Sequence, residues 1–346
     1  MKMPKLYLLS KGKSSQIDLI YYLAAEFNIK SFLIDIYDYN HSITLNQVGI
    51  IIDGETVISP AIFYQYGLSA DYLTVPDYTD NRKNWTYFQD SQPILEQLNS
   101  QALSLMSYAT QQKGCITINN PVDSFDLKSR LIQYKTLKSL GLNTPEFILT
   151  NSLSALKITE IYNNSDNILW SYPDSDSPIK SLKKINLNKL LNDKTDIPYL
   201  FMSQVSGTEV RAWFLDDKPL LACSIKNPEY DVDSTEMLEK FTYHKPGKSL
   251  YNLGESLKKH FKGFFEMHGI IDENGDLTIY NIDLVPDFMY LGSQGQKYLA
   301  CEFLISLLEK FNINVENKAE LPETESRIGV FLGRMLESLF AAEGAN

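Results

Sequence analysis

The stretch Gly275–Phe288 carries two polar side chains placed for chemistry at the end of an apolar strand. Asn281 and Asp283 are separated by one residue, and period-two alternation predicts that both share a strand face with Leu277 and Ile279. Two neighbouring oxygen ligands suit a hard cation such as Mg²⁺, with nucleotide phosphates completing its shell. The plainer alternative is a polar strand end beside a loop. The order of the other elements in the chain distinguishes these two interpretations.

The N-terminal part of the chain has the pattern of a βαβ unit. Residues 5–10 and 31–35 are short apolar runs that predict buried strands, and residues 15–27 between them have helical spacing. This order predicts an α/β domain with two parallel strands. Gly12-Lys13-Ser14 is not a P-loop, because Tyr7 stands where that motif needs its first glycine.

A second unit follows, with an amphipathic helix and two strands. Residues 128–140 have helical spacing up to Gly141, and residues 152–163 predict another helix. Strands are expected at residues 144–150 and 167–172.

The last unit combines strands with long helices. It is predicted to contain a strand at 199–204, a hairpin of 209–215 with 218–225, a helix at 251–268, and closing helices at 298–311 and 326–340. Residues 227–247 are too long and polar for a simple connection and are expected to form an active-site loop. The apolar face of the last helix would pack on the core or pair across a homodimer.

Composition narrows the class of protein. The 346 residues include 32 basic and 43 acidic side chains, a net charge of −11, which argues against nucleic-acid and anionic-membrane partners. Three widely spaced cysteines and four histidines make a disulfide framework or zinc site improbable. No segment has the length of a membrane span or the form of a signal peptide. A soluble, cytoplasmic protein is expected.

Taken in order, these landmarks resemble the ATP-grasp superfamily, and most nearly its ribosomal-protein glutamate ligases and graspetide (microviridin-type) peptide ligases. The resemblance is carried by residues 119–121, 129–151, 198–213, 221–226 and the Asn281-x-Asp283 strand, where the family usually has Glu-x-Asn. It implies an α/β (α+β) ATP-grasp fold with an N-terminal domain at 1–121, a central subdomain at 122–196 and a C-terminal subdomain at 197–346.

The same resemblance implies nucleotide-binding residues. Arg130 stands where the family has its first ATP lysine, and a guanidinium can hold phosphate in bidentate fashion. The second lysine is missing at Ser171-Tyr172, and Lys180, Lys183 or Lys184 on the next segment would have to replace it. The alternative for Arg130 is a solvated residue at a helix start.

The strand at 200–205 corresponds to the hinge that meets adenine through its backbone. Met202, Ser203 and Val205 are therefore expected at the nucleotide, followed by Glu209. Ser203 takes the position at which a glutamate is usual.

Four cations are candidates for contact with phosphate or substrate. They are Arg211, Lys226, His244 and Lys245. Arg211 matches a family arginine; its alternative is a surface-strand residue. His244 and Lys245 lie where the glutamate ligases carry a basic loop, and a solvated loop is the alternative.

The implied metal ligands depart from the family pattern. His268 falls at the first position, with Glu266 and Asp272 as neighbouring alternatives, and Asn281 and Asp283 fall at the second and third. One carboxylate is lost, which predicts weaker Mg²⁺ binding.

Two functions therefore remain open. The first is an ATP- and Mg²⁺-dependent ligase that activates a carboxylate as an acyl phosphate and joins it to an amine or hydroxyl, on a peptide or protein substrate. The second is a catalytically impaired relative that binds a nucleotide, a peptide or a catalytic sister ligase. A Rossmann dehydrogenase is disfavoured, since no Gly-x-Gly-x-x-Gly follows the first strand.

Overall fold

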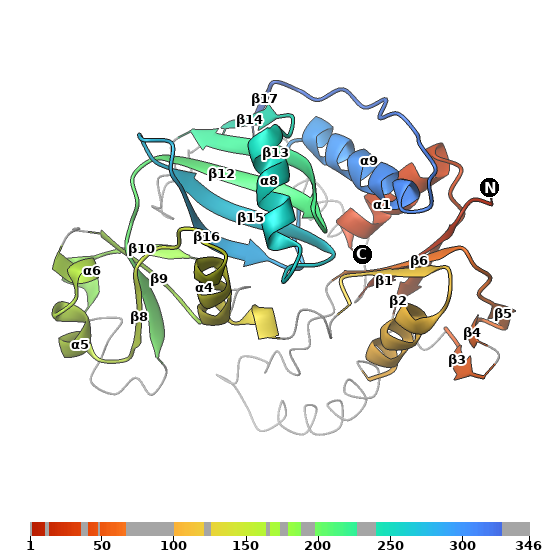
Figure 1. Ribbon diagram of the computed structural model, residues 1–346, viewed down its shortest axis with the longest axis horizontal. Helices are drawn as coiled ribbons and strands as arrows, with labels where there is room; N and C mark the ends of the chain where they lie inside the picture. The colour runs from red at the N-terminus through yellow and green to blue at the C-terminus, as the bar shows by residue number, and fades with distance from the viewer. Residues whose placement is uncertain are drawn as a thin grey trace, which may run out of the picture.

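The computed structural model describes residues 2–10, 14–35, 41–47, 49–66, 100–120, 126–163, 167–173, 179–187, 198–226 and 240–326. These residues form four sheets with helices packed on them (Figure 1). Residues 85–111 have the length and spacing of one long helix. Most of this segment, most of the predicted loop at 227–247 and the last predicted helix fall outside the described residues; residues 100–111 are helical. No helix in the described part of the chain is long and apolar enough to cross a bilayer.

The N-terminal sheet confirms the predicted βαβ unit. Its strands are β1 (Lys5–Ser10), β2 (Ser31–Asp35), β6 (Ala61–Tyr66) and β7 (Cys115–Ile118), all parallel in the order β2-β1-β6-β7. Helix α1 (Ser15–Glu26) begins where the Ser14 side chain accepts a hydrogen bond from the Ile17 amide. Strand β6 is rich in aromatic residues, and Phe63 and Tyr64 are completely buried in it.

A three-stranded antiparallel sheet adjoins this domain. It consists of β3 (Ile43–Asn46), β4 (Gly49–Ile52) and β5 (Glu55–Thr56). Asp53 and Gly54 form the turn between β4 and β5, and both have the positive φ that a tight hairpin turn requires, 51° and 79°.

The central sheet is antiparallel, in the order β10-β9-β11-β8. Its strands are β8 (Phe147–Thr150), β9 (Asn167–Ser171), β10 (Lys180–Lys183) and β11 (Tyr199–Met202). The short 3₁₀ turn η2 (Lys184–Asn186) follows β10 directly, and another, η1 (Asp126–Lys128), lies earlier in the chain. The single helix predicted at 152–163 is broken into α5 (Leu153–Lys157) and α6 (Glu160–Asn163). Strand β11 pairs with β8 and β9, so the division between sheets follows Met202, whereas the predicted domain boundary lies before residue 197.

Helix α4 (Arg130–Ser139) joins the central sheet to the large C-terminal sheet (Figure 1). The Tyr134 hydroxyl contacts the Met202 sulfur at 3.1 Å, and the Gln133 side chain bonds the backbone N–H and C=O of Ile282 at 3.0 and 2.7 Å. Gln133 thereby occupies the open edge of a strand. This contact fixes α4 against the strand that carries Asn281 and Asp283.

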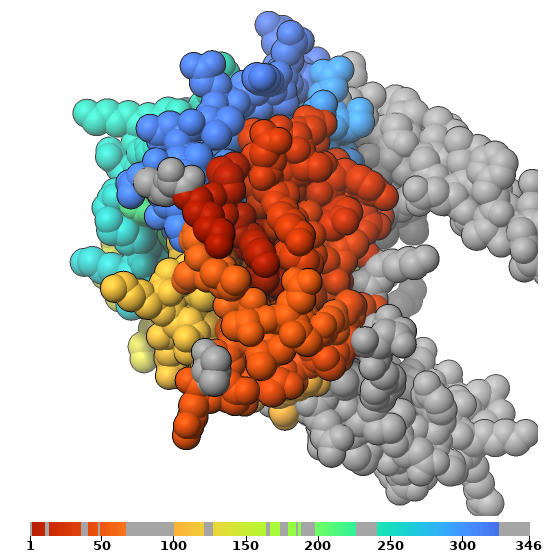
Figure 2. Space-filling view, turned by 90° about the vertical axis from the view of Figure 1, so that its right-hand side faces the viewer, coloured from red at the N-terminus to blue at the C-terminus, as the bar shows by residue number. Residues whose placement is uncertain are grey.

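The C-terminal sheet has six antiparallel strands in the order β16-β15-β12-β13-β14-β17. They are β12 (Thr208–Leu215), β13 (Lys218–Lys226), β14 (Lys240–His244), β15 (Phe264–Ile271), β16 (Leu277–Asp283) and β17 (Thr324–Ser326). Helix α8 (Lys248–Leu257) packs on one face, where Leu253 and Leu257 meet Phe214 and Phe265. Helix α9 (Ser293–Glu309) covers the other face and also packs on α1, so the N-terminal domain and the end of the described chain adjoin one another (Figure 2).

The helix predicted at 251–268 is wrong in its second half. Helix α8 ends at Leu257, and Gly263 then takes a φ of +85° with Asn119 so close that an added Cβ would lie 2.4 Å from the Asn119 side-chain oxygen. Only glycine fits this position. The chain continues as β15, which is hydrogen-bonded to strands on both sides. Glu266 and His268 therefore lie on a strand.

Candidate functional site

Strand register gathers several predicted site residues on one face of the C-terminal sheet. Asp283 pairs with Glu266 and Asn281 with His268, and His268 pairs on its other side with Arg211. Directly paired residues share a face. The residues that the sequence assigned to metal and to phosphate therefore lie side by side.

The predicted single face of β16 is only partly correct. Ile279 pairs with Gly269, and Asn281 pairs with the preceding residue of β15, His268. Tyr280 between them therefore has no paired residue on β15 and forms a β-bulge. Gly269 and His268 point to opposite faces, which places Ile279 opposite Asn281. The expected row of Leu277 and Ile279 beside Asn281 and Asp283 is thus wrong, because one extra residue shifts the alternation.

Arg211 and Glu266 are the centre of a charged cluster. The Arg211 Nε donates to Glu209 Oε1 at 3.0 Å, and its Nη1 lies 3.7 Å from Glu266 Oε1. The Tyr290 hydroxyl donates to the same Glu266 oxygen, and the Arg211 guanidinium stacks 4.8 Å from the centre of the Tyr290 ring. The His268 Nε2 is 2.8 Å from Glu266 Oε1, an electrostatic contact outside hydrogen-bond geometry.

These contacts keep both central groups ionised. Burial alone would raise the pKa of Glu266, but His268, Arg211 and Tyr290 outweigh it and hold that pKa below its ordinary value of 4.5. Burial would likewise lower the pKa of Arg211, while Tyr290, Glu266 and Glu209 raise it above its usual range. Glu266 is only 1% exposed, so it is a buried charge stabilised by its neighbours.

Arg130 lies beside β16, the strand that the sequence predicts to carry metal ligands. It is fully buried, and its Nε donates to Asn281 Oδ1 at 3.2 Å. Its Nη1 reaches the Tyr172 carbonyl at 3.5 Å, at the end of β9. The guanidinium presents no exposed surface to a phosphate in this arrangement, and the use of Arg130 for ATP remains a prediction.

The residues at this strand do not fit a Mg²⁺ site. Mg²⁺ requires several unobstructed oxygen ligands in octahedral geometry. The Asn281 oxygen instead accepts from a guanidinium, and His268 contacts a carboxylate that Tyr290 and Arg211 also contact. Within the described residues, no three or more His, Cys, Asp or Glu side chains lie close enough together to hold a metal ion. Two arginines contact residues expected to hold the metal: Arg130 contacts Asn281, and Arg211 contacts Glu266.

The hinge is filled by a side chain from β16. The Tyr280 hydroxyl donates to the Ser203 carbonyl and accepts from the Val205 amide, both at 2.8 Å. The Ser203 side chain accepts from the Glu146 amide at 3.0 Å, which ties the hinge to the central sheet. Tyr280 is 4% exposed, and burial raises its pKa to about 12, so its hydroxyl stays protonated.

Lys180 lies on the wrong face of the central sheet to join Met202. It pairs with Trp170, and its Nζ lies 5.4 Å from the centre of the Trp170 ring. Trp170 packs with the core under α5 and α6, whereas Met202 packs with α4. A role for Lys180 in place of the missing lysine remains a prediction without support from this geometry.

The remaining predicted cations are dispersed. His244 is the last residue of β14, with its Nε2 3.0 Å from the Ser224 hydroxyl oxygen. It pairs with Ala222, whereas Arg211 pairs with Cys223, so His244 and Arg211 lie on opposite faces. Lys245 follows as an exposed residue, and Lys226 ends β13 beside Lys240. His244 belongs to the end of β14, although the sequence placed it in a loop, whereas Lys245 lies in the segment that connects β14 to α8.

Sequence reasoning missed the two tyrosines that complete these contacts. Tyr290 follows the end of β16 by seven residues, and no sequence motif around it predicts its hydrogen bond to Glu266. Tyr280 was assigned to the opposite strand face by simple alternation. The bulge that reorients it has no signal in the sequence, since residues 277–283 contain no glycine.

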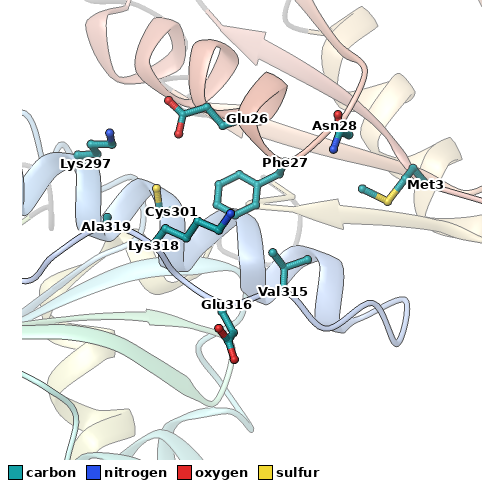
Figure 3. A pocket seen from close by; sticks show the side chains of 10 residues that line it. All are labelled: Met3, Glu26, Phe27, Asn28, Lys297, Cys301, Val315, Glu316, Lys318 and Ala319. Carbon is teal, nitrogen blue, oxygen red and sulfur yellow. The ribbon is translucent and has the colours of Figure 1, made fainter.

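A cavity of about 350 Å³ lies elsewhere, between the end of α1 and α9 (Figure 3). Phe27, Cys301 and Lys318 are among its lining residues, and none of the predicted site residues lines it. Burial raises the pKa of Cys301 to about 11, so its thiol is largely protonated near neutral pH. This cavity is separate from the cluster and the hinge.

Comparison with solved structures identifies the fold. One match is the ATP-grasp ligase PsnB complexed with minimal precursor, Mg and ADP, with a TM-score of 0.68 and 14% identity over 88% of this chain and 98% of that one. The macrocyclase MdnC from Microcystis aeruginosa MRC, bound with precursor peptide MdnA, matches with a TM-score of 0.64 and 13% identity over 88% and 100%.

A third match is the RiPP-associated ATP-grasp ligase of Chryseobacterium gregarium, in complex with ADP and a leader and core peptide. Its TM-score is 0.63, with 12% identity over 92% of this chain and 100% of that one. No protein-family model and no curated protein sequence matches the chain. At these identities the likeness concerns the fold, and the predicted fold is confirmed: this chain has the ATP-grasp fold of the RiPP peptide ligases.

Proposed function

We propose that this chain is a peptide- or protein-binding protein built on the ATP-grasp fold, in which phosphoryl transfer has been lost. The observation that carries the proposal is the bond from the buried Arg130 guanidinium to Asn281, on the strand expected to hold the metal. A protein cation there opposes a metal ion by charge and takes an oxygen that the metal would need.

Phosphoryl transfer asks the protein for little beyond positioning and charge neutralisation. Both depend on metal ions and mobile cations that face the phosphates. Here Arg130 is fully buried, and Glu266 is bound by Tyr290, Arg211 and His268. Ser171 and Tyr172 stand where a second cation is expected. Each departure removes a different part of the machinery.

Peptide binding is supported by the solved structures with this fold. Solved structures of PsnB and MdnC contain precursor peptides, and that of the Chryseobacterium gregarium ligase contains a leader and core peptide. We extend peptide or protein recognition, including recognition of a catalytic sister ligase or a second copy of the chain, to this protein. All three of its cysteines are free, which fits a reducing compartment such as the cytoplasm.

The second candidate is an active ATP- and Mg²⁺-dependent carboxylate–amine or carboxylate–hydroxyl ligase. It is favoured by Arg211, which Glu209, Glu266 and Tyr290 keep charged on the face that also carries Asp283. In that role Arg211 would stabilise developing negative charge on an acyl phosphate. PsnB has been observed with Mg and ADP.

Nucleotide turnover separates the two candidates. The purified chain is incubated with MgATP and a carboxylate-containing peptide pool, and ADP release is measured for wild type and Asp283→Asn. We expect both proteins to release ADP at the same background rate. Turnover by the wild type that Asp283→Asn abolishes would establish the ligase and end the proposal of lost activity.

A further inference from the structure

We infer that Tyr280 is a built-in substitute for a bound purine base, so that the hinge of the wild-type chain is closed to adenine nucleotides. The inference deepens the proposed function, on which it rests, by naming the residue that determines what the hinge accepts. It is carried by the two hydrogen bonds of one hydroxyl to Ser203 and Val205.

The hinge exposes a particular pair of backbone groups. The Ser203 carbonyl is an acceptor, and the Val205 N–H, two residues later, is a donor. A ligand edge that offers a donor next to an acceptor satisfies both, as the amino group and ring nitrogen of a 6-aminopurine do. A hydroxyl is donor and acceptor in one atom, and Tyr280 uses it in both ways at 2.8 Å.

Three further features hold Tyr280 in this position: a bulge in the strand, a hydrogen bond to its carbonyl and the burial of its ring. The bulge in β16 removes Tyr280 from the strand ladder, which frees its backbone and redirects its side chain. Its carbonyl then accepts from the Tyr134 hydroxyl at 2.8 Å. Its ring is buried in the apolar cluster that includes Met202, Leu169 and Tyr134, with Val205 against it.

A base cannot reach the hinge while this tyrosine is present. The Ser203 carbonyl and the Val205 amide are partly buried and both are bonded to this hydroxyl, so a base must displace the hydroxyl and replace both of its hydrogen bonds. The ring occupies the adjoining space as well. Removing the ring should leave a cavity bordered by a donor and an acceptor, and cavities left by large apolar side chains can bind flat aromatic ligands.

The test uses ligands without phosphate or metal. Wild type, Tyr280→Ala and the exposed control Tyr251→Ala are titrated by calorimetry with adenine and with p-cresol, which reproduces the deleted side chain. We expect Tyr280→Ala alone to bind both compounds, with adenine affinity at least about tenfold above the wild-type limit. Adenine binding by wild type, or a Tyr280→Ala variant that binds p-cresol and refuses adenine, would overturn the inference.

If Tyr280→Ala does not fold, a second measurement on the wild type and on Tyr280→Phe tests the inference. Hydrogen exchange at the Val205 amide is followed in the wild type, with and without about 5 mM adenosine, and in Tyr280→Phe. We expect no effect of adenosine on the wild type and exchange at least about tenfold faster in Tyr280→Phe. Protection of Val205 by adenosine, or unchanged exchange in Tyr280→Phe, contradicts the inference.

The two proposals can fail separately. Lack of adenine binding in a folded Tyr280→Ala variant overturns the role of Tyr280 and leaves the loss of phosphoryl transfer intact. ADP release that depends on Asp283 overturns the loss of activity, and the adenine titration of Tyr280→Ala still reports whether the hinge is a base site.

Discussion

The charged cluster around Arg211 and the hinge around Tyr280 satisfy their polar groups in different ways. In the cluster, a buried carboxylate is held by a guanidinium, an imidazole and a phenol, so every member depends on the ionisation of another. In the hinge, a neutral hydroxyl serves two backbone groups. Both arrangements make a ligand unnecessary for stability.

The two regions should differ in how much stability they lose when one hydrogen-bonding or charged partner is removed. A buried charge without its counter-charge is costly, whereas an unpaired backbone N–H or C=O costs much less. The cluster should therefore behave as a structural element that tolerates little change. The hinge should be the part of the molecule that is easier to open.

The largest expected effect is in the cluster. Glu266→Ala removes the acceptor shared by Tyr290, Arg211 and His268 and should lower the free energy of unfolding by about 3–5 kcal/mol. The matched control Glu309→Ala removes the exposed pair with Lys218 and should cost about 1 kcal/mol or less. Urea unfolding measures both. Equal losses in the two variants would show that the cluster is no more structural than a surface pair.

The corresponding change at the hinge should be smaller. Tyr280→Phe removes the two hydrogen bonds from the hydroxyl to the partly buried Ser203 carbonyl and Val205 amide and should lower the free energy of unfolding by about 1–3 kcal/mol. Tyr251→Phe, at an exposed tyrosine on α8, should have almost no effect. The same urea experiment compares them. A loss as large as that of Glu266→Ala would remove the proposed distinction between the two regions.

Metal binding tests whether the residue types at positions 268 and 281 prevent a metal site beside the cluster. The double variant His268→Asp with Asn281→Glu restores two carboxylates beside Asp283 and should strengthen Mn²⁺ binding at least tenfold, or about 1.4 kcal/mol. The control Asn252→Glu with His260→Asp makes the same changes at exposed positions. Calorimetry measures the binding. An equal gain in the control would mean that added charge alone explains it.

The smallest effect is expected on the central sheet. Lys180→Met removes a cation from the Trp170 ring and should change the free energy of unfolding by less than about 1 kcal/mol, without altering adenine binding by Tyr280→Ala. Lys184→Met, which removes a cation from the Tyr162 ring, is the matched control. If Lys180→Met alone weakened binding of ATP to Tyr280→Ala, Lys180 would be the substitute for the missing lysine.

Local patterns predicted the parts of the fold that depend on neighbours in sequence. The apolar runs of β1 and β2 and the periodic helix between them specify a βαβ unit. The same holds for α4 and for the β12–β13 hairpin. The segment 251–268 failed because Phe261, Phe264, Phe265 and His268 also match helical spacing; pairing with β12 and β16 makes its second half a strand.

By itself, the sequence determined which chemical groups this protein possesses. It has one carboxylate and one amide, Asp283 and Asn281, on β16. It has Arg130 where the ATP-grasp ligases have their first ATP lysine, and no lysine at the end of β9, where the second is expected. Only the tertiary structure decided what those groups bind. Arg130 meets Asn281 across 151 residues of chain, and Tyr280 reaches the hinge through a bulge. Such contacts depend on strand register and burial, because a one-residue shift changes which face a side chain occupies and therefore which partner it meets.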